Sequence, residues 1–133
     1  MTQEGAASQQ VKLLFVDDEM EFAAVMAKRL GRLGYQVAVA GDGSEALRLA
    51  RATDFEVAVL DLKMAGMDGQ EVLRTLLMLL PRIKVVMLTG HGSREIAEQC
   101  LKMGAFAYLN KPCAFSELVA NIERAATEAG HRS

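Results

Sequence analysis

Carboxylates follow two apolar segments of this chain, at positions where they could bind a cation or accept a transferred group. Asp17 and Asp18 come directly after residues 11–16, and Asp61 comes directly after residues 57–60. Carboxylates held close together repel one another, so a positive group must relieve the repulsion. A hard cation such as Mg²⁺ suits this role, because it binds one or two carboxylates, a carbonyl oxygen and several waters.

Two more apolar segments lead into groups that can hold phosphoryl oxygens. Thr89 follows residues 83–88, and Lys111 lies just beyond residues 105–109. A metal, a lysine, a hydroxyl and a carboxylate nucleophile together form a phosphoryl-transfer site. Asp61 is the best candidate for the nucleophile, because it stands alone, whereas the other two aspartates form a pair suited to holding the metal.

Short apolar runs alternate with amphipathic stretches along the chain, which predicts strands alternating with helices. The expected strands are residues 11–16, 36–40, 57–60, 83–88 and 105–109. Apolar residues recur at helical spacing in the expected helices, which fall within residues 23–33, 46–50, 72–80, 96–103 and 115–126. Because strands separated by helices pair in parallel, the predicted fold class is α/β. It is a (βα)5 doubly wound, five-stranded parallel sheet with the flavodoxin-like strand order 2-1-3-4-5.

The predicted topology gathers the candidate groups at one edge of the sheet. In open α/β sheets, ligands bind beyond the carboxyl ends of the strands. With this order the first and third strands are neighbours, so the three aspartates would share one pocket. Thr89 and Lys111 would flank that pocket.

Local signals place the ends of the first two helices. The first helix is expected to bury the face formed by Ala23, Met26, Leu30 and Leu33. Gly34 offers a C-terminal stop for it. Either Asp42 or Ser44 is available as the N-cap of the second helix.

Composition limits the classes of protein to which the chain can belong. It has 133 residues, 51% of them hydrophobic, which suits one globular domain. Its 15 Lys and Arg against 17 Asp and Glu argue against direct nucleic-acid binding, which normally needs a basic stripe. No apolar run approaches the roughly 20 residues of a membrane helix. Residues 1–10 lack the features of a signal peptide, so we expect a cytoplasmic protein without a membrane partner.

The chain is expected to form one domain between two tails. A flexible N-terminal tail should cover residues 1–10, the domain residues 11–127, and a C-terminal tail residues 128–133. Cys100 and Cys113 form no CxxC pair, so reduced thiols are expected rather than a disulfide.

Several short segments together carry a resemblance to a known family. They are Val16-Asp17-Asp18, Asp61-Leu62-Lys63-Met64 running to Met67-Asp68-Gly69, Leu88-Thr89-Gly90, and Tyr108 with Lys111-Pro112. In their order and spacing, the chain resembles a response-regulator receiver domain, the phosphoacceptor half of two-component signalling, across about residues 11–127.

Two positions depart from the pattern of that family. Ala65 stands where proline is usual, which predicts a more mobile loop after Asp61. Cys113 stands where phenylalanine is common, which predicts a looser start of the last helix. Neither change touches the phosphorylation chemistry.

The resemblance implies that Asp61 accepts a phosphoryl group from the phosphohistidine of a sensor histidine kinase or phosphotransfer protein. It also implies a set of Mg²⁺ ligands. Asp18 and Asp61 would bind the ion directly, Asp17 would bind it through water, and the backbone carbonyl of Lys63 would complete the protein's share. Such a domain catalyses only its own phosphorylation and dephosphorylation, and is otherwise not an enzyme.

The resemblance further implies a switch. Lys111 and the Thr89 hydroxyl would hold phosphoryl oxygens, and Tyr108 would swing inward when Thr89 moves. The fourth helix, the fifth strand and the fifth helix would then form an output surface for a downstream protein or a phosphorylation-dependent homodimer. The residues near that surface are Arg94, Ile96, Cys100, Met103 and Tyr108 beside Asn121, and Cys100 itself is expected to be a small buried hydrophobic residue.

Two residues at the rim of the predicted pocket are candidates for tuning the lifetime of the phosphoryl group. Lys63 lies two residues beyond Asp61, and His91 lies two residues beyond Thr89. Both side chains are long enough to shade or orient the water that would attack the phosphoryl group.

Two other functions fit parts of the sequence. The segment Gly41-Asp42-Gly43-Ser44-Glu45-Ala46 matches the GxGxx(G/A) pattern of nucleotide-binding domains. It follows the second strand rather than the first, and its two acids would repel a pyrophosphate. An aspartate-nucleophile phosphatase of the haloacid-dehalogenase type would need a second acid where Lys63 stands, and a cap domain for which 133 residues leave no room.

Overall fold

The computed structural model describes residues 10–64 and 66–130. Most of the two predicted tails and position 65 lie outside these residues, so the mobility expected there stays a prediction. The last helix ends at Glu128, one residue beyond the end expected for the domain.

Strands and helices alternate along the described chain, as the sequence predicts. The strands are β1 (Lys12–Val16), β2 (Gln36–Ala40), β3 (Val57–Leu60), β4 (Lys84–Thr89) and β5 (Ala107–Asn110). The helices are α2 (Met20–Arg32), α3 (Gly43–Ala52), α4 (Gly69–Leu79), α5 (Arg94–Met103) and α6 (Phe115–Glu128).

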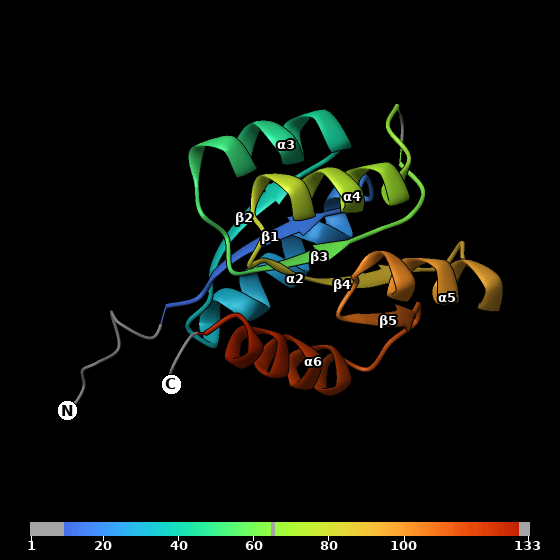
Figure 1. Ribbon diagram of the computed structural model, residues 1–133. Coiled ribbons are helices and arrows are strands. Elements are labelled where there is room, and N and C mark those ends of the chain that lie inside the picture. The colour runs from blue at the N-terminus through green and yellow to red at the C-terminus, as the bar shows by residue number, and fades with distance from the viewer. Residues whose placement is uncertain (1–9, 65, 131–133) are drawn as a thin grey trace.

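All neighbouring strands pair in parallel, in the order β2-β1-β3-β4-β5. The predicted fold class and strand order are therefore confirmed. Central strand β1 illustrates the register, because Leu14 pairs with Ala38 on one side and with Ala58 on the other. Figure 1 shows α3, α4 and α5 on one face of this sheet and α2 and α6 on the opposite face.

Both faces of the sheet are buried, which explains why its strands are almost continuously apolar. Leu13 and Phe15 pack with α2 and α6, whereas Leu14 and Val16 pack with α3 and α4. Alternate residues of one strand thus enter opposite halves of the core. Together the two halves fix the sheet whose edge carries the candidate site.

Polar side chains cap three of the helices. Asp42, not Ser44, is the N-cap of α3, and its carboxylate accepts a hydrogen bond from the Glu45 N–H at 2.8 Å. Asp68 caps α4 and Ser93 caps α5 in the same way. Such caps satisfy N–H groups that the helix itself leaves unpaired.

Several boundaries differ from the predicted ones by one or two residues. Helix α2 ends at Arg32, so Leu33 adopts a cap conformation and is 54% exposed instead of joining the buried face. Strands β4 and β5 each run one residue further than predicted, because Thr89 pairs in register with Asn110. Thr89 is therefore the last residue of a strand and not the first residue of a loop.

In the part of the chain that the structure describes, no helix is both long enough and apolar enough to cross a membrane.

Candidate functional site

Two adjacent strands deliver the central carboxylates. Val16 at the end of β1 pairs with Leu60 at the end of β3, so the residues that follow them emerge side by side. The Asp61 N–H donates a hydrogen bond to the Val16 carbonyl at 3.1 Å, and the Asp17 N–H donates to the Ala40 carbonyl at 3.0 Å. Asp17 is 1% exposed and Asp61 is 3% exposed. Backbone pairing thus holds both carboxylates at a buried edge of the sheet.

The aspartates form a cluster that could hold a metal ion. One carboxylate oxygen from each of Asp17, Asp18 and Asp61 lies within 4.8 Å of the others. Asp18 is exposed, so the cluster opens to solvent on its side. The Oδ1 atom of Asp61 is buried and has no hydrogen-bond partner among the described residues. A carboxylate oxygen in that state fits a hard divalent cation, whose ligands are oxygens.

Lys111 supplies the positive charge of the site. Its Nζ lies 2.7 Å from Asp17 Oδ2, 2.8 Å from Glu19 Oε1 and 3.6 Å from Asp61 Oδ2. The same ammonium lies 4.6 Å from the centre of the Phe22 ring. One lysine therefore neutralises part of the charge of three carboxylates that the chain brings together from two strand ends.

Burial and charge shift the acid–base behaviour of these groups. Burial raises the pKa of Asp17, although the hydrogen bonds from Lys111 and from the Glu19 N–H oppose that shift. The hydrogen bond from Lys111 lowers the pKa of exposed Glu19. Burial alone would lower the pKa of Lys111, but its hydrogen bonds to Asp17 and Glu19 raise it overall. Lys111 is therefore charged at neutral pH.

Thr89 brings a hydroxyl to the same edge from β4, the strand next to β3. The residue is fully buried, and its Oγ1 accepts a hydrogen bond from the His91 N–H at 3.1 Å. Its carbonyl accepts a second bond from the Lys111 N–H at 2.9 Å. The backbone thus links the candidate hydroxyl directly to the candidate lysine.

Tyr108 lies on β5, next to the strand that carries Thr89. Its ring is partly buried, and its hydroxyl is buried without a hydrogen-bond partner among residues 10–64 and 66–130. Burial raises the pKa of this phenol. The hydroxyl therefore points into the protein in this structure.

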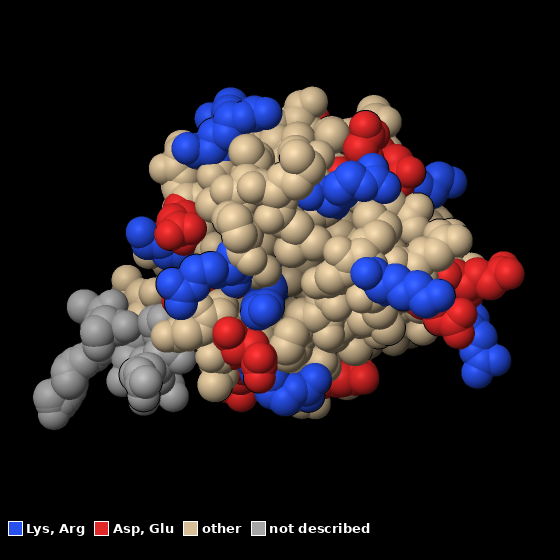
Figure 2. Space-filling view, in the orientation of Figure 1, with Lys and Arg blue, Asp and Glu red and all other residues tan. Residues whose placement is uncertain are grey.

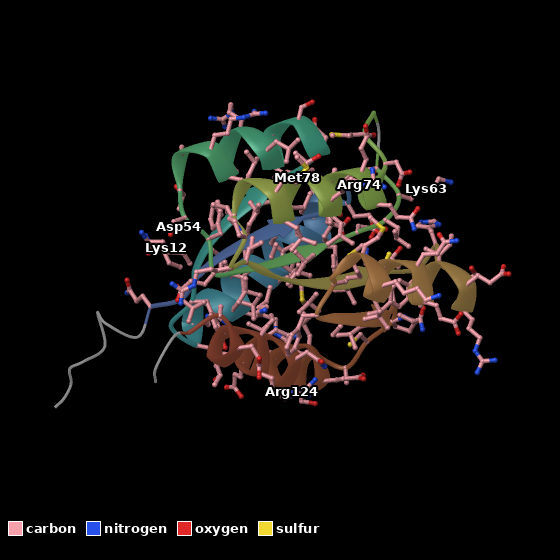
Figure 3. The ribbon with its side chains drawn as sticks, in the orientation of Figure 1. Lys12, Asp54, Lys63, Arg74, Met78 and Arg124 are labelled. Carbon is pink, nitrogen blue, oxygen red and sulfur yellow. The ribbon has the colours of Figure 1, made fainter. Side chains whose placement is uncertain are left out.

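Lys63 and His91 are both exposed and line one depression of about 350 Å³, together with Leu62, Asp68 and Gln70. Figure 3 shows Lys63 on the loop after β3, with its side chain directed away from the sheet. The two rim residues that the sequence singles out are thus brought to one hollow.

Two residues of the site carry roles that the sequence analysis did not assign. Glu19 forms an ion pair with Lys111. The sequence shows only that Glu19 directly follows Asp17 and Asp18, and gives no sign of its partner. Gly69 has no room for a side chain, because an added Cβ would lie 2.5 Å from the Asp61 carbonyl oxygen and from Leu62 Cα. Its N–H donates a hydrogen bond to the Leu62 carbonyl at 2.8 Å, which closes the loop after Asp61. The one feature of the sequence that could have indicated this role of Gly69 is its position directly after Asp68, the N-cap of α4.

The expected output surface is only partly exposed. Arg94 is exposed, and Ile96, Met103 and Tyr108 are partly exposed. Cys100 is buried, as expected for a small apolar residue, and Asn121 is buried as well, so the place given to Asn121 on that surface was wrong. Cys100 faces the core side of α5, and the Asn121 amide donates a hydrogen bond to the Glu117 carbonyl of its own helix.

Comparison with known proteins identifies the family of this chain. Residues 13–123 match the family model of the response regulator receiver domain. The chain is 37% identical over 115 residues to the transcriptional regulatory protein ZraR of Escherichia coli K12, a match that covers 86% of this chain and 26% of that protein. It is 32% identical to CusR of the same organism over 84% of this chain and 49% of that protein. The chain thus spans about a quarter to a half of these curated relatives.

Solved structures of response regulators have the same fold as this chain. A CheY-like receiver domain from Methanospirillum hungatei superposes with a TM-score of 0.87 at 30% identity, covering 91% of this chain and 97% of that one. A response regulator from Burkholderia pseudomallei, solved with a phosphorylated aspartic acid, calcium ion and citrate, superposes with a TM-score of 0.82 at 35% identity. That match covers 91% of this chain and 71% of that one. The family model and the similar structures show that this chain belongs to the family of response-regulator receiver domains, which are signalling domains of two-component systems.

Proposed function

We propose that Asp61 is the phosphoacceptor of this receiver domain, and that its phosphoryl donor is the phosphohistidine of a sensor histidine kinase or phosphotransfer protein. The observation that carries the proposal is the state of the Asp61 carboxylate. It is buried, one of its oxygens has no partner among the described residues, and the other lies 3.6 Å from the Lys111 ammonium. A buried carboxylate with so few hydrogen-bond partners is available to bind a cation and to attack a phosphoryl group.

The transfer makes one bond and breaks one bond. An oxygen of Asp61 attacks phosphorus and forms the new P–O bond, while the P–N bond of the donor breaks and its electron pair returns to the imidazole nitrogen. Negative charge spreads over the phosphoryl oxygens during this step. Lys111 and the Thr89 hydroxyl are the nearby donors that can stabilise that charge. Hydrolysis later breaks the acyl phosphate by attack of water.

The same residues fit a bound Mg²⁺. Asp18 and Asp61 would be direct ligands, Asp17 would act through water, and the Lys63 carbonyl would complete the set. When bound, the ion neutralises charge on the phosphoryl oxygens. Asp17 cannot easily give both oxygens to a metal, because Oδ2 accepts from Lys111 and Oδ1 accepts from the Glu19 N–H at 2.9 Å. This arrangement supports an indirect role for Asp17.

Phosphorylation would change the surface formed by α5, β5 and α6. A phosphoryl group accepts hydrogen bonds strongly and would draw the Thr89 hydroxyl toward Asp61. Tyr108 would then favour its inward position. A domain that already samples this state shifts its population rather than adopting a new shape. The shifted form would bind a downstream protein or a second copy of the chain in the cytoplasm.

The charge distribution favours a protein partner over nucleic acid. Figure 2 shows basic and acidic side chains interspersed around a neutral centre on the face that carries α3, α4 and α5. Direct nucleic-acid binding by this domain would need a stripe of basic residues. The net charge of −2 gives no support to such binding.

The alternative functions lose support from the geometry. In the nucleotide-like segment, Asp42 caps α3 and the Glu45 carboxylate accepts from the Gly41 N–H at 3.3 Å, so acids already occupy the helix N-terminus. In place of the second acid of a phosphatase, exposed Lys63 follows Asp61.

Binding of a phosphoryl analogue separates these functions. We expect beryllofluoride with Mg²⁺ to shift the amide resonances of the Asp61 pocket, and NAD to shift none. Asp61→Asn should remove the response, whereas Asp54→Asn, at an exposed aspartate outside the site, should keep it. Shifts induced by NAD at the Gly41–Ala46 segment, without a response to beryllofluoride, would favour nucleotide binding instead.

A further inference from the structure

Tyr108 occupies a space that position 92 leaves open only because it is a glycine. A Cβ built on Gly92 would overlap the Tyr108 hydroxyl oxygen and would lie 2.7 Å from Cζ of the same ring. The added Cβ would also lie 3.1 Å from Leu62 Cδ1, so it has little room to move away from the tyrosine. The tip of the tyrosine therefore lies where any other residue at position 92 would place its side chain.

Gly92 is needed here for space and not for backbone conformation. Its φ is outside the left-handed region, unlike that of Gly34, Gly66, Gly104 and Gly130. The strain that an alanine meets at a positive φ therefore does not arise at this position. The effect of a substitution at position 92 should therefore come chiefly from the overlap with Tyr108, since the contact with Leu62 is much less severe.

The tip of the Tyr108 ring lies in a space between Gly92 and Leu62, which we call its seat. Both of these residues are connected to the phosphoacceptor site. Leu62 directly follows Asp61 at the end of β3. Gly92 lies in the loop after Thr89, and the neighbouring His91 N–H is the donor to Thr89 Oγ1. Movement of the Thr89 hydroxyl would therefore act on the loop that carries Gly92. The tyrosine itself lies on β5, at the edge of the proposed output surface.

We propose that Gly92 is a positioning residue that sets where the Tyr108 ring lies. With glycine, the ring enters the seat between Gly92 and Leu62. With any larger residue, the ring must leave the seat and turn toward solvent. The orientation of Tyr108 follows from this steric relation, and only the link of that orientation to phosphorylation rests on the proposed function.

Fluorine NMR can observe the ring directly, because the chain has 2 tyrosines and no tryptophan. Protein labelled with 3-fluorotyrosine should give one signal set for Tyr35 and one for Tyr108, assigned with Tyr108→Phe. In the unsubstituted protein, we expect the Tyr108 signal to show contacts to the Leu62 methyl groups and almost no change between H₂O and D₂O. Gly92→Ala should abolish those contacts and introduce a solvent isotope shift. The Tyr35 signal should not change.

Gly90→Ala is the matched control in the same loop. A Cβ at Gly90 would meet only Lys111 Cβ, at 3.7 Å, which is an ordinary contact. This variant should keep the Tyr108 signal of the unsubstituted protein. A Gly92→Ala protein that retains both the Leu62 contacts and the solvent-shielded signal would overturn the proposal.

A double variant guards against a general effect on folding. If Gly92 acts only through the ring, adding Gly92→Ala to Tyr108→Ala should not lower the midpoint of urea unfolding any further. A further loss of stability in the double variant would mean that Gly92 has a separate structural role, which contradicts the proposal.

The link to signalling has its own readout. With beryllofluoride and Mg²⁺, Gly92→Ala should show shifts in the Asp61 pocket but lose those across residues 94–109. Shifts across residues 94–109 equal to those of the unsubstituted protein would overturn the link. Failure of the unsubstituted protein to respond at all would instead contradict the proposed function, and the fluorine experiment would still decide the role of Gly92.

Discussion

Lys111 lies closer to Asp17 than to the phosphoacceptor candidate: its Nζ is 2.7 Å from Asp17 Oδ2, against 3.6 Å from Asp61 Oδ2. Asp17 is almost completely buried, and burial raises its pKa. The lysine therefore has a structural task, which is to stabilise a buried carboxylate. It can also serve the chemistry, since a small rotation of its side chain would carry the ammonium to an oxygen on Asp61.

Lys111→Met should affect both tasks. Loss of the ammonium leaves Asp17 Oδ2 without its charged donor, and we expect the free energy of unfolding to fall by about 1–3 kcal/mol. Phosphorylation by acetyl phosphate should slow by at least about tenfold, because a charged donor to the phosphoryl oxygens is lost. Urea unfolding and the rate of mass increase measure the two effects. Glu19→Gln breaks only the exposed pair, which solvent screens, and should lower the stability much less than Lys111→Met does. Equal losses of stability in the two variants would show that the contact between Lys111 and buried Asp17 does not stabilise the fold more than the exposed pair does.

Asp18→Asn should weaken Mg²⁺ binding by about tenfold or more, because it removes one of the few charged ligands of the site. Isothermal titration of the protein with MgCl₂ measures the affinity. Labelling by acetyl phosphate should be lost in excess chelator and should return when Mg²⁺ is restored. Labelling that persists in chelator would refute the role of the metal.

Lys63→Ala and His91→Ala should each change the lifetime of the phosphorylated state by about two- to tenfold without moving the site of labelling, since both side chains line the hollow beside Asp61. The measurement is the decay of the phosphorylated mass after removal of the donor. Arg74→Ala is a suitable control, because Arg74 is an exposed residue of α4 outside that hollow (Figure 3). Unchanged lifetimes in both test variants would exclude this role.

Stability should fall at alkaline pH through Tyr35. Burial, with a smaller effect of the Glu123 carboxylate, raises the pKa of Tyr35 from its ordinary value of 10.0 to about 12. The folded state then holds the phenolic proton more tightly than the unfolded state does, so this contribution is complete below about pH 10 and is lost as the pH rises toward about 12. Urea unfolding at pH 8 to 11 should show a smaller decrease for Tyr35→Phe than for the unsubstituted protein, and parallel curves would contradict the assignment.

The strands and their order could be predicted because burial on both faces forces continuous apolar runs. The run before Asp61 has exactly the length of β3, and the polar residue that ends it lies at the edge of the sheet. Boundaries were less predictable where pairing decides them. Thr89 joins β4 because Asn110 lies opposite it, and no local property of Thr89 reveals that partner.

The remaining features could not be predicted from the sequence, because they depend on contacts between elements that lie far apart in the chain. The bond between Glu19 and Lys111 joins residues 92 positions apart, so an acidic run in the sequence could not identify which acid would meet the lysine. The seat of Tyr108 likewise needs Gly92 and Leu62 from two different loops, which only the folded chain brings together.

The site of phosphorylation is the central claim, and intact-mass spectrometry after incubation with acetyl phosphate and Mg²⁺ tests it most directly. We expect the unsubstituted protein and the Asp54→Asn control to gain one phosphoryl group each, and Asp61→Asn to gain none. A phosphoryl group on Asp61→Asn under the same conditions would contradict the assignment of Asp61 as the phosphoacceptor.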